Sequence, residues 1–393
     1  MSDILFGRRI KVTIYKQGLT QEELQEALSE SPDDTGLPND GTPQQNSSAP
    51  ESGSGILSFE IDESLPLEFE VTKTLDNSGK SNTATLRVYG ISEATARAMG
   101  YQMLTCKISV GYRGQQLIPI FLGDILSASY KRGKKSEAGY ADFQMSQSYL
   151  KLNAGYKLSM NFPRDTDLLK ILSEVMDTFG IEFKFLSADS ITEELLQQKI
   201  TYGLALDGTL NECLQKVLKP YGFKWHINEA NQVEVFQDDV YSSTDGKVGT
   251  IAGGKLKVEE VKADETRTGT GLTIYELGYD SGLIERPYLE TESITNRLSE
   301  TKPQDNSKPE KTKAKPAKKK SLVKKVTFAR QVVNFTTLLL PEIQPKTVVK
   351  IDAGVGNESV SGLYGIISVK YKGQTFGNDW YCQCVGVSTE KEA

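Results

Sequence analysis

The chain has 393 residues and a formal net charge of −6, with 38% hydrophobic and 25% charged residues. This length allows two or three compact domains, and the composition is that of a soluble globular protein. The acidic balance argues against a general nucleic-acid-binding protein. No apolar run approaches the roughly 20 residues that span a bilayer, and the N-terminus has no secretory h-region, so we expect cytoplasmic assembly without stable nucleic-acid or membrane binding.

Residues 1–150 are predicted to form a β-rich block. Apolar and polar residues alternate in several segments, as in strands with one buried face: residues 67–72, 85–89, 107–110, 118–125, 128–130 and 140–147. A short helix is expected at 92–99, with Ser92 as N-cap and Gly100 just after its end.

An acidic insertion interrupts this block at residues 17–55. It contains eight acidic residues and no Lys or Arg, and it is rich in Ser, Pro, Gly, Asn and Gln. Such a segment cannot bury enough apolar surface to offset the entropy of ordering. We therefore expect a disordered-like surface loop. Thr20 and Glu23 form a weak capping-box pattern, which allows one short helix at 20–29.

Residues 151–240 are predicted to form a small α/β insert. Apolar residues have helical spacing in residues 168–179 and again in 210–221, with Gly180 and Gly222 directly after them. Thr209 and Glu212 form a capping-box pattern before the second helix. A strand follows each helix, and the two helix–strand units align at an offset of 42 residues. A hairpin is expected between residues 224–227 and 233–236.

Residues 241–393 are predicted to form a second β-rich block. The expected strands lie at residues 270–278, 326–333, 347–351, 365–371 and 380–387. Ten lysines fall between Lys302 and Lys325, within a Lys-rich insertion at 299–325. This insertion could contact phosphates, an acidic protein surface or anionic lipid, but a solvated surface loop is favoured.

The first and last blocks share a short internal similarity. Residues 108–115 (ISVGYRGQ) and 367–374 (ISVKYKGQ) are identical at six of eight positions. A strand followed by a turn is common, so chance can account for this match. It nevertheless indicates that the two blocks are related copies.

No motif in the sequence assigns catalytic chemistry. His226 lies on a predicted strand between two apolar residues, without a nucleophile elbow or a His-Glu-x-x-His helix elsewhere, so a half-buried strand histidine is favoured. Paired carboxylates are harder to exclude, because a glycosidase needs only two acids that the fold brings together. The acids considered for such a pair are Asp124, Asp142, Glu174 and Asp207.

Cofactor and metal sites are also not indicated. The glycine pairs at 253–254 and 269/271 are interpreted as turns, since neither has the context of a phosphate-binding loop. Cys382 and Cys384 point to one face of a predicted strand, which favours a buried apolar face over half of a zinc site. We therefore expect no catalytic, cofactor-binding or metal-binding residues, and a protein that is not an enzyme.

Two sets of segments carry a resemblance to a known family. The first set contains residues 67–73, 82–92, 108–114 and 120–125, and the second contains 337–345, 348–351 and 362–373. Both sets resemble the baseplate hub proteins of contractile-tailed bacteriophages, the late control D class, which is related to the spike proteins of type VI secretion. The resemblance rests on pattern and order and covers nearly all of the chain except the two insertions.

This resemblance implies a mainly β fold, in which two tail-tube-like β-barrel domains bracket a two-helix α/β domain. It implies a homotrimer whose pseudo-six-fold ring joins the hexameric tail tube to the trimeric spike in the virion baseplate. The implied partners are the spike protein, the tail tube or tube-initiator protein, the tape-measure protein and baseplate wedge proteins. The insertions depart from the family pattern and are expected outside the ring. Alternatives are a hub with cell-wall hydrolase activity and a generic β-rich binding or adhesin module.

Overall fold

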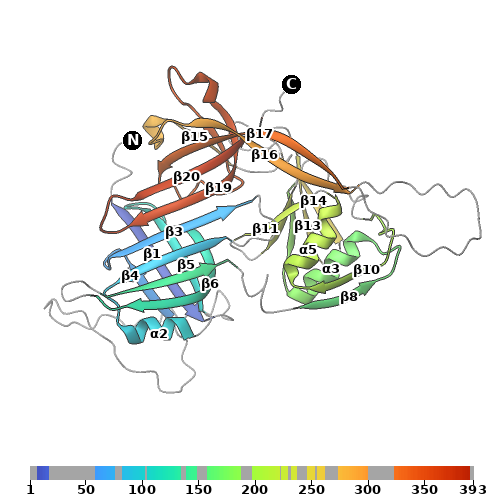
Figure 1. Cartoon of the computed structure of the whole chain (residues 1–393), viewed down its shortest axis with the longest axis horizontal. Coiled ribbons are helices and arrows are strands. Elements are labelled where there is room, and N and C mark those ends of the chain that lie inside the picture. Colours follow the sequence, from blue (N-terminus) through green and yellow to red (C-terminus); the bar gives the residue numbers. More distant parts are fainter. Residues whose placement is uncertain are drawn as a thin grey trace, which may run out of the picture.

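The computed structural model describes residues 7–16, 58–75, 82–101, 104–133, 139–147, 157–186, 197–221, 223–228, 232–236, 246–252, 255–261, 273–299 and 323–389. These residues form a mainly β structure with a small α/β insert, which confirms the predicted fold class. Figure 1 shows a large sheet body on one side and the insert with its helices on the other. No helix among the described residues is long and apolar enough to cross a membrane.

The first block contributes seven antiparallel strands in the order β3-β4-β7-β6-β5-β1-β2. The strands are β1 (Arg8–Lys16), β2 (Ser58–Asp62), β3 (Leu67–Thr74), β4 (Thr83–Tyr89), β5 (Leu104–Tyr112), β6 (Ile118–Lys131) and β7 (Tyr140–Ser146). Burial alternates along the whole of β3, as the sequence pattern predicts. The two segments expected at 118–125 and 128–130 form one continuous strand, and β1 and β2 were not predicted.

Helix α2 (Glu93–Tyr101) begins where the sequence predicts. The backbone N–H of Thr95 donates to Ser92 Oγ at 3.1 Å, so Ser92 caps the helix. The helix continues through Gly100, and the predicted end before that residue is wrong. Met99 is 2% exposed, and its burial carries the helix past a glycine that costs only about 1 kcal/mol in a helix.

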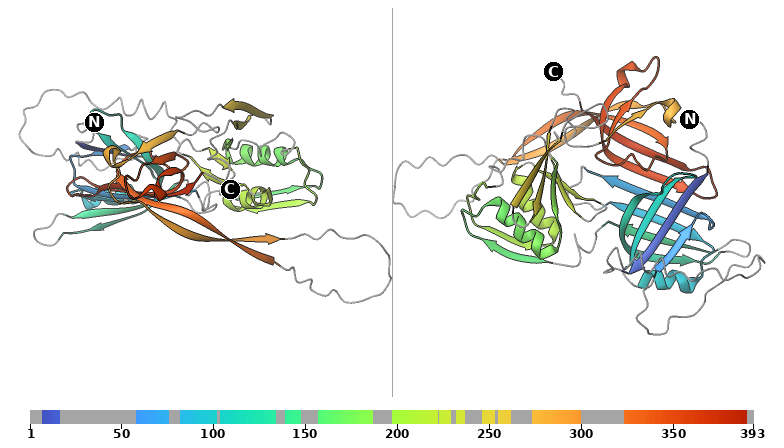
Figure 2. Two further views of the ribbon diagram at one scale, coloured as in Figure 1. Left: turned by 90° about the horizontal axis from the view of Figure 1, so that it is seen from above. Right: turned by 180° about the vertical axis from the view of Figure 1, so that it is seen from behind.

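The last block contributes six strands. They are β15 (Ile274–Leu277), β16 (Tyr288–Ser299), β17 (Val323–Leu338), β18 (Val348–Ile351), β19 (Gly362–Gln374) and β20 (Trp380–Ser388). β16 was not predicted, because its sequence YLETESITNRLS has little apolar alternation. Figure 2 shows β16 and β17 as a long ribbon that leaves the body.

The two β-blocks are joined into one 13-stranded sheet by pairing between β3 and β19. This seam is antiparallel, with Val71 opposite Tyr371. Buried side chains from both blocks form one hydrophobic cluster. Among the described strands the main path runs from β16 to β2 without a closing pair, so closure of either block into a barrel remains a prediction.

The internal similarity falls on equivalent parts of two hairpins. Residues 108–112 lie in β5, which pairs with β6, and residues 367–374 lie in β19, which pairs with β20. The aligned Tyr112 and Tyr371 are 2% and 0% exposed. Both hairpins also have a register shift beside the aligned Ile-Ser pair. These shared features support the duplication, although β19 continues as a strand where the chain turns after β5.

The insert contains both predicted helix–strand units. Its elements are β8 (Leu158–Phe162), α3 (Leu168–Phe179), β9 (Phe183–Leu186), β10 (Leu204–Gly208), α5 (Leu210–Leu218), a 3₁₀ turn (Lys219–Tyr221), β11 (Lys224–Ile227), β12 (Val233–Phe236), β13 (Gly246–Ala252) and β14 (Lys255–Val261). The Thr209–Glu212 capping box is formed, and Gly180 ends α3 with φ 59°. The insert sheet has the order β11-β12-β9-β13-β14, so strands beyond the boundary predicted at residue 240 pair with it.

Both insertions connect neighbouring antiparallel strands. Tyr15 pairs with Ser58 across the acidic insertion, and Ser299 pairs with Val323 across the Lys-rich one. Residues 17–55, with the helix considered at 20–29, lie outside the described residues, as do 300–322 and the glycines at 222, 253–254, 269 and 271. Strands therefore stand on both sides of each insertion.

Candidate functional site

The insert meets the sheet body at the seam between the two β-blocks. Phe236, at the end of β12, is 3% exposed and packs in a small apolar cluster with Leu75, Val348 and Ile367. Leu75 follows β3 and Ile367 lies in β19, so the cluster that holds Phe236 includes residues from both sides of the seam. The insert therefore covers the place where the two blocks join.

The two faces of β12 have different roles. Val233 and Val235 belong to the core cluster that contains the helices of the insert. Successive side chains of a strand point to opposite faces, so Glu234 and Phe236 point away from those helices. His226 lies directly opposite Glu234 on β11. The body-facing side of the insert thus presents one aromatic anchor and one carboxylate.

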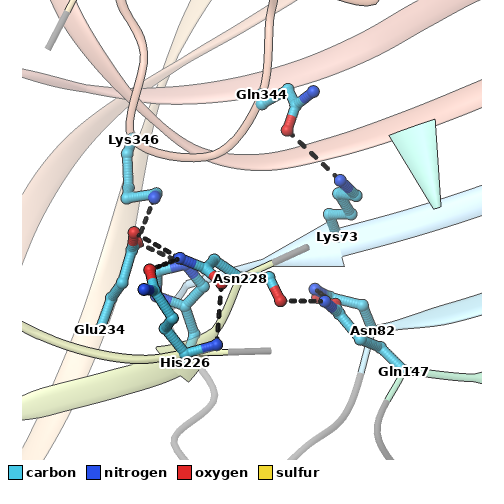
Figure 3. Close-up of polar contacts among 9 residues, drawn as sticks. Lys73, Asn82, Gln147, His226, Asn228, Glu234, Gln344 and Lys346 are labelled. Atoms are coloured by element: carbon cyan, nitrogen blue, oxygen red, sulfur yellow. Dashed lines mark hydrogen bonds and ion pairs between the residues drawn. The ribbon is translucent and has the colours of Figure 1, made fainter. Parts of the chain in front are cut away.

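Glu234 is 4% exposed and accepts hydrogen bonds from three side chains. His226 Nε2 lies 3.2 Å from Glu234 Oε2, and Asn228 Nδ2 lies 2.9 Å from Oε1. Lys346 Nζ, from the body, donates to Oε2 (Figure 3). Burial alone would raise the pKa of Glu234, but the His226 hydrogen bond and the Lys346 charge outweigh burial and hold the pKa well below its usual range.

Lys346 reaches the carboxylate from the segment between β17 and β18. Its φ is 85°, a left-handed conformation that is uncommon for a residue other than glycine. The backbone N–H of Lys346 donates to Ile366 O at 2.9 Å. Two residues earlier, Gln344 Nε2 donates to Pro119 O at 3.3 Å, and Lys73 Nζ donates to Gln344 Oε1 at 3.4 Å. This segment therefore links the last block to the first.

A hydrogen bond between uncharged groups also joins the insert to the sheet body. Gln147 Nε2, at the end of β7, donates to Asn228 O of the insert at 3.2 Å. Asn82 Nδ2 donates to Gln147 Oε1 at 2.5 Å and so orients it (Figure 3). The buried polar junction, defined as Lys73, Asn82, Gln147, His226, Asn228, Glu234, Gln344 and Lys346, thus draws side chains from all three blocks.

The geometry of the buried polar junction is suited to holding the insert against the sheet body. His226 has the acidic neighbour that a catalytic base needs, but the other groups that hold this acid are a lysine and an amide. Phe236 also packs edge-on against the imidazole, with ring centroids 5.7 Å apart. An arrangement in which donors satisfy a buried carboxylate fixes the position of one element against another.

The four acids considered for a catalytic pair lie in separate places. Asp142 is 2.6 Å from Arg87 Nε, and Glu174 is 3.9 Å from Lys170 on α3. Asp124 is buried on β6, and Asp207 lies on β10 of the insert. The structure does not bring any two of them together as a pair.

All four cysteines are buried free thiols. Cys382 and Cys384 are 0% and 2% exposed and both belong to the main core, as predicted for an apolar strand face. Within the described part of the chain, no group of three or more His, Cys, Asp or Glu residues could hold a metal ion.

Burial raises the pKa of the Cys382 thiol to about 12. Because the thiolate is the reactive form, we expect the native protein to show no rapid thiol labelling by a disulfide reagent at pH 8. All four thiols should react after unfolding in urea. Rapid labelling of Cys382 in the folded protein would contradict the buried strand face.

The low pKa of Glu234 predicts acid sensitivity of the buried polar junction. A carboxylate with a depressed folded pKa stabilises the fold fully above its unfolded pKa, here 4.5, and this contribution declines as pH falls from there toward the folded pKa. We expect the unfolding free energies of wild type and Glu234→Gln to converge as pH falls from 6 to 3. Urea unfolding at each pH measures this, and a constant difference between the two proteins would contradict it.

No family model matches the sequence, and the search of curated proteins gives no match. The chain is similar in structure to the 43 kDa tail protein of prophage MuSo2 from Shewanella oneidensis, with a TM-score of 0.49 and 10% identity over 86% of this chain and 97% of that chain.

Two further solved structures are similar. A tail protein from Neisseria meningitidis has a TM-score of 0.48 and 8% identity, over 82% of this chain and 96% of that chain. A type VI secretion component from Escherichia coli has a TM-score of 0.46 and 8% identity, over 82% of this chain and 73% of that chain. Two of these proteins are named as tail proteins and one as a component of type VI secretion. At identities of 8–10%, the likeness concerns the course of the chain, and function has to be argued from its residues.

Proposed function

We propose that this chain is a structural hub subunit of a contractile phage tail baseplate, located in the virion. Three copies form a ring with pseudo-six-fold symmetry that joins the hexameric tail tube to the trimeric spike. The chain acts as an adaptor between symmetries and not as an enzyme. Its partners are the spike and the tail tube or tube-initiator protein, with tape-measure and wedge proteins around them.

One observation carries this proposal: a single chain holds two β-blocks side by side in one sheet, with matching hairpins at β5–β6 and β19–β20. Three such chains present six related faces. The buried polar junction and Phe236 fix the insert over the seam, so each chain behaves as one rigid adaptor. The division into blocks at residues 1–150, 151–240 and 241–393 belongs to this proposal, with β13 and β14 favouring a later end of the insert.

The stoichiometry in purified tails tests this function. A three-fold-averaged electron-microscopy image of the baseplate should contain three copies of this 43.4-kDa chain, arranged as six similar β-blocks around the axis. Sedimentation of the chain together with its spike protein should give a complex that contains three copies. A single copy, or a chain absent from the tail, would contradict the proposal, and cell-wall hydrolysis by the purified chain would contradict its structural character.

The two insertions belong outside this ring, where their opposite charges steer contacts with surrounding baseplate proteins or with each other. The paired ends Ser299 and Val323 allow a short turn to replace residues 300–322 without disturbing β16 and β17. Deletion of this segment should lower baseplate assembly. Normal assembly and infectivity of the deletion would contradict the role in contacts.

A further inference from the structure

We propose that Lys346 is a latch that holds the insert in one orientation on the sheet body, and that breaking its contact with Glu234 frees the insert to move as a folded unit. This inference goes beyond the hub function. It rests on the geometry of one chain and holds whether or not three chains assemble.

The insert and the body have separate hydrophobic cores. One cluster contains the buried residues of the sheet body, and a second contains those of the insert. Among the described residues, the apolar cluster between them has four buried members, Leu75, Phe236, Val348 and Ile367, with Ile274, Leu363, Val385 and Val387 packed against it. Units with their own cores and a small interface are expected to move relative to one another unless specific contacts prevent it. The orientation of the insert therefore depends strongly on the contacts around Phe236 and Glu234.

The Glu234 carboxylate keeps donors from its own unit when the insert is released. His226 and Asn228, which both hold the Glu234 carboxylate, belong to the insert itself. The Lys346 ammonium brings a positive charge to this carboxylate from the body. Loss of that contact leaves Glu234 with its own histidine and amide donors. The released insert is thus a viable folded state, as a latch requires.

The backbone of Lys346 supports the same conclusion. A positive φ in a residue other than glycine costs free energy and persists only where surrounding contacts enforce it. In the described chain two such residues occur, Asp165 and Lys346. Asp165 has a side chain that is 60% exposed, whereas that of Lys346 is 20% exposed and is tied to Glu234. The Glu234 contact therefore helps to hold Lys346 in a conformation that can relax when the contact breaks.

Hydrogen exchange of the full-length chain tests the latch. In Lys346→Met and in Glu234→Gln, we expect amides of residues 344–348 and 365–368 to exchange at least tenfold faster, while amides in α3 and α5 keep their wild-type rates. Small-angle scattering should show a larger radius of gyration for both variants. The matched control is Lys350→Met, because Lys350 pairs with Glu276 where both side chains are more than half exposed, and this variant should behave as wild type.

A glycine variant separates charge from backbone strain. Lys346→Gly removes the ammonium, so it should release the insert as Lys346→Met does. Because glycine tolerates a positive φ, the glycine variant should unfold at a higher temperature than the methionine variant. Unchanged exchange at 344–348 in both Lys346→Met and Glu234→Gln would overturn the latch. Equal acceleration in α3 and α5 would also overturn it, since the contact would then serve folding of the insert. Equal unfolding temperatures of the glycine and methionine variants would overturn the role of backbone strain.

Discussion

Phe236→Ala is expected to detach the insert from the sheet body and to lower the free energy of docking by about 3–5 kcal/mol. Phe236 is 3% exposed and packs against Leu75, Val348 and Ile367, which come from both sides of the seam. Its removal deletes a buried aromatic contact between insert and body and leaves a cavity that the packed strands around it cannot close. Urea unfolding should change from one transition to two, with the insert keeping its helical circular dichroism in the first.

Phe185→Ala is the matched control for this prediction. Phe185 is 0% exposed and belongs to the core of the insert, on β9 beside β12. Its replacement should unfold the insert itself, with loss of the helical signal in the first transition. If Phe236→Ala and Phe185→Ala gave the same loss of helical signal, Phe236 would be a folding residue of the insert and not its anchor on the body.

Much of the fold follows from local patterns in the sequence. The alternation in β3 and the capping box before α5 each depend on a few neighbouring residues, and both form as predicted. Strand β1 was missed although Ile10, Val12 and Ile14 alternate with polar residues and are 0% exposed. Its pairing with β2 could not be predicted, because the acidic insertion separates the two strands in the sequence. The seam between β3 and β19 joins residues about 300 positions apart, and no local pattern indicates which strands meet there.

The candidate site, too, could be predicted only in part from the sequence. The hairpin predicted between residues 224–227 and 233–236 already places His226 opposite Glu234, so the contact between these two residues could be found from strand register alone. His226 was predicted to be a half-buried strand histidine, and its partner Glu234 was missed. Lys346 could not be found, since its role depends on a left-handed backbone and on how the insert docks. Local periodicity gives neither the backbone conformation of Lys346 nor the docking of the insert.

Gly373→Ala is expected to destabilise the seam by about 1–3 kcal/mol through overpacking. Gly373 lies opposite Phe69 on β3 and opposite Trp380 on β20. A Cβ at this position would lie 2.5 Å from Phe69 Cζ and 2.8 Å from Trp380 Cε3. The two rings form an edge-to-face pair with centroids 5.7 Å apart, so they cannot both move away without losing that contact. Thermal unfolding of the variant measures the effect.

Two further variants show whether space at the seam is the cause. Gly278→Ala, with no neighbouring atom closer than 3.7 Å to the added Cβ, should change stability little. Phe69→Leu in the Gly373→Ala background should recover part of the loss, because the shorter side chain makes room for the methyl group, and the two changes should be non-additive.

Gly114, which aligns with Gly373 in the internal similarity, has φ 85° and open space around it. The earlier hairpin therefore uses its glycine to turn the chain, whereas the later one uses it to bring two blocks together, and additive effects of Phe69→Leu and Gly373→Ala would contradict that distinction.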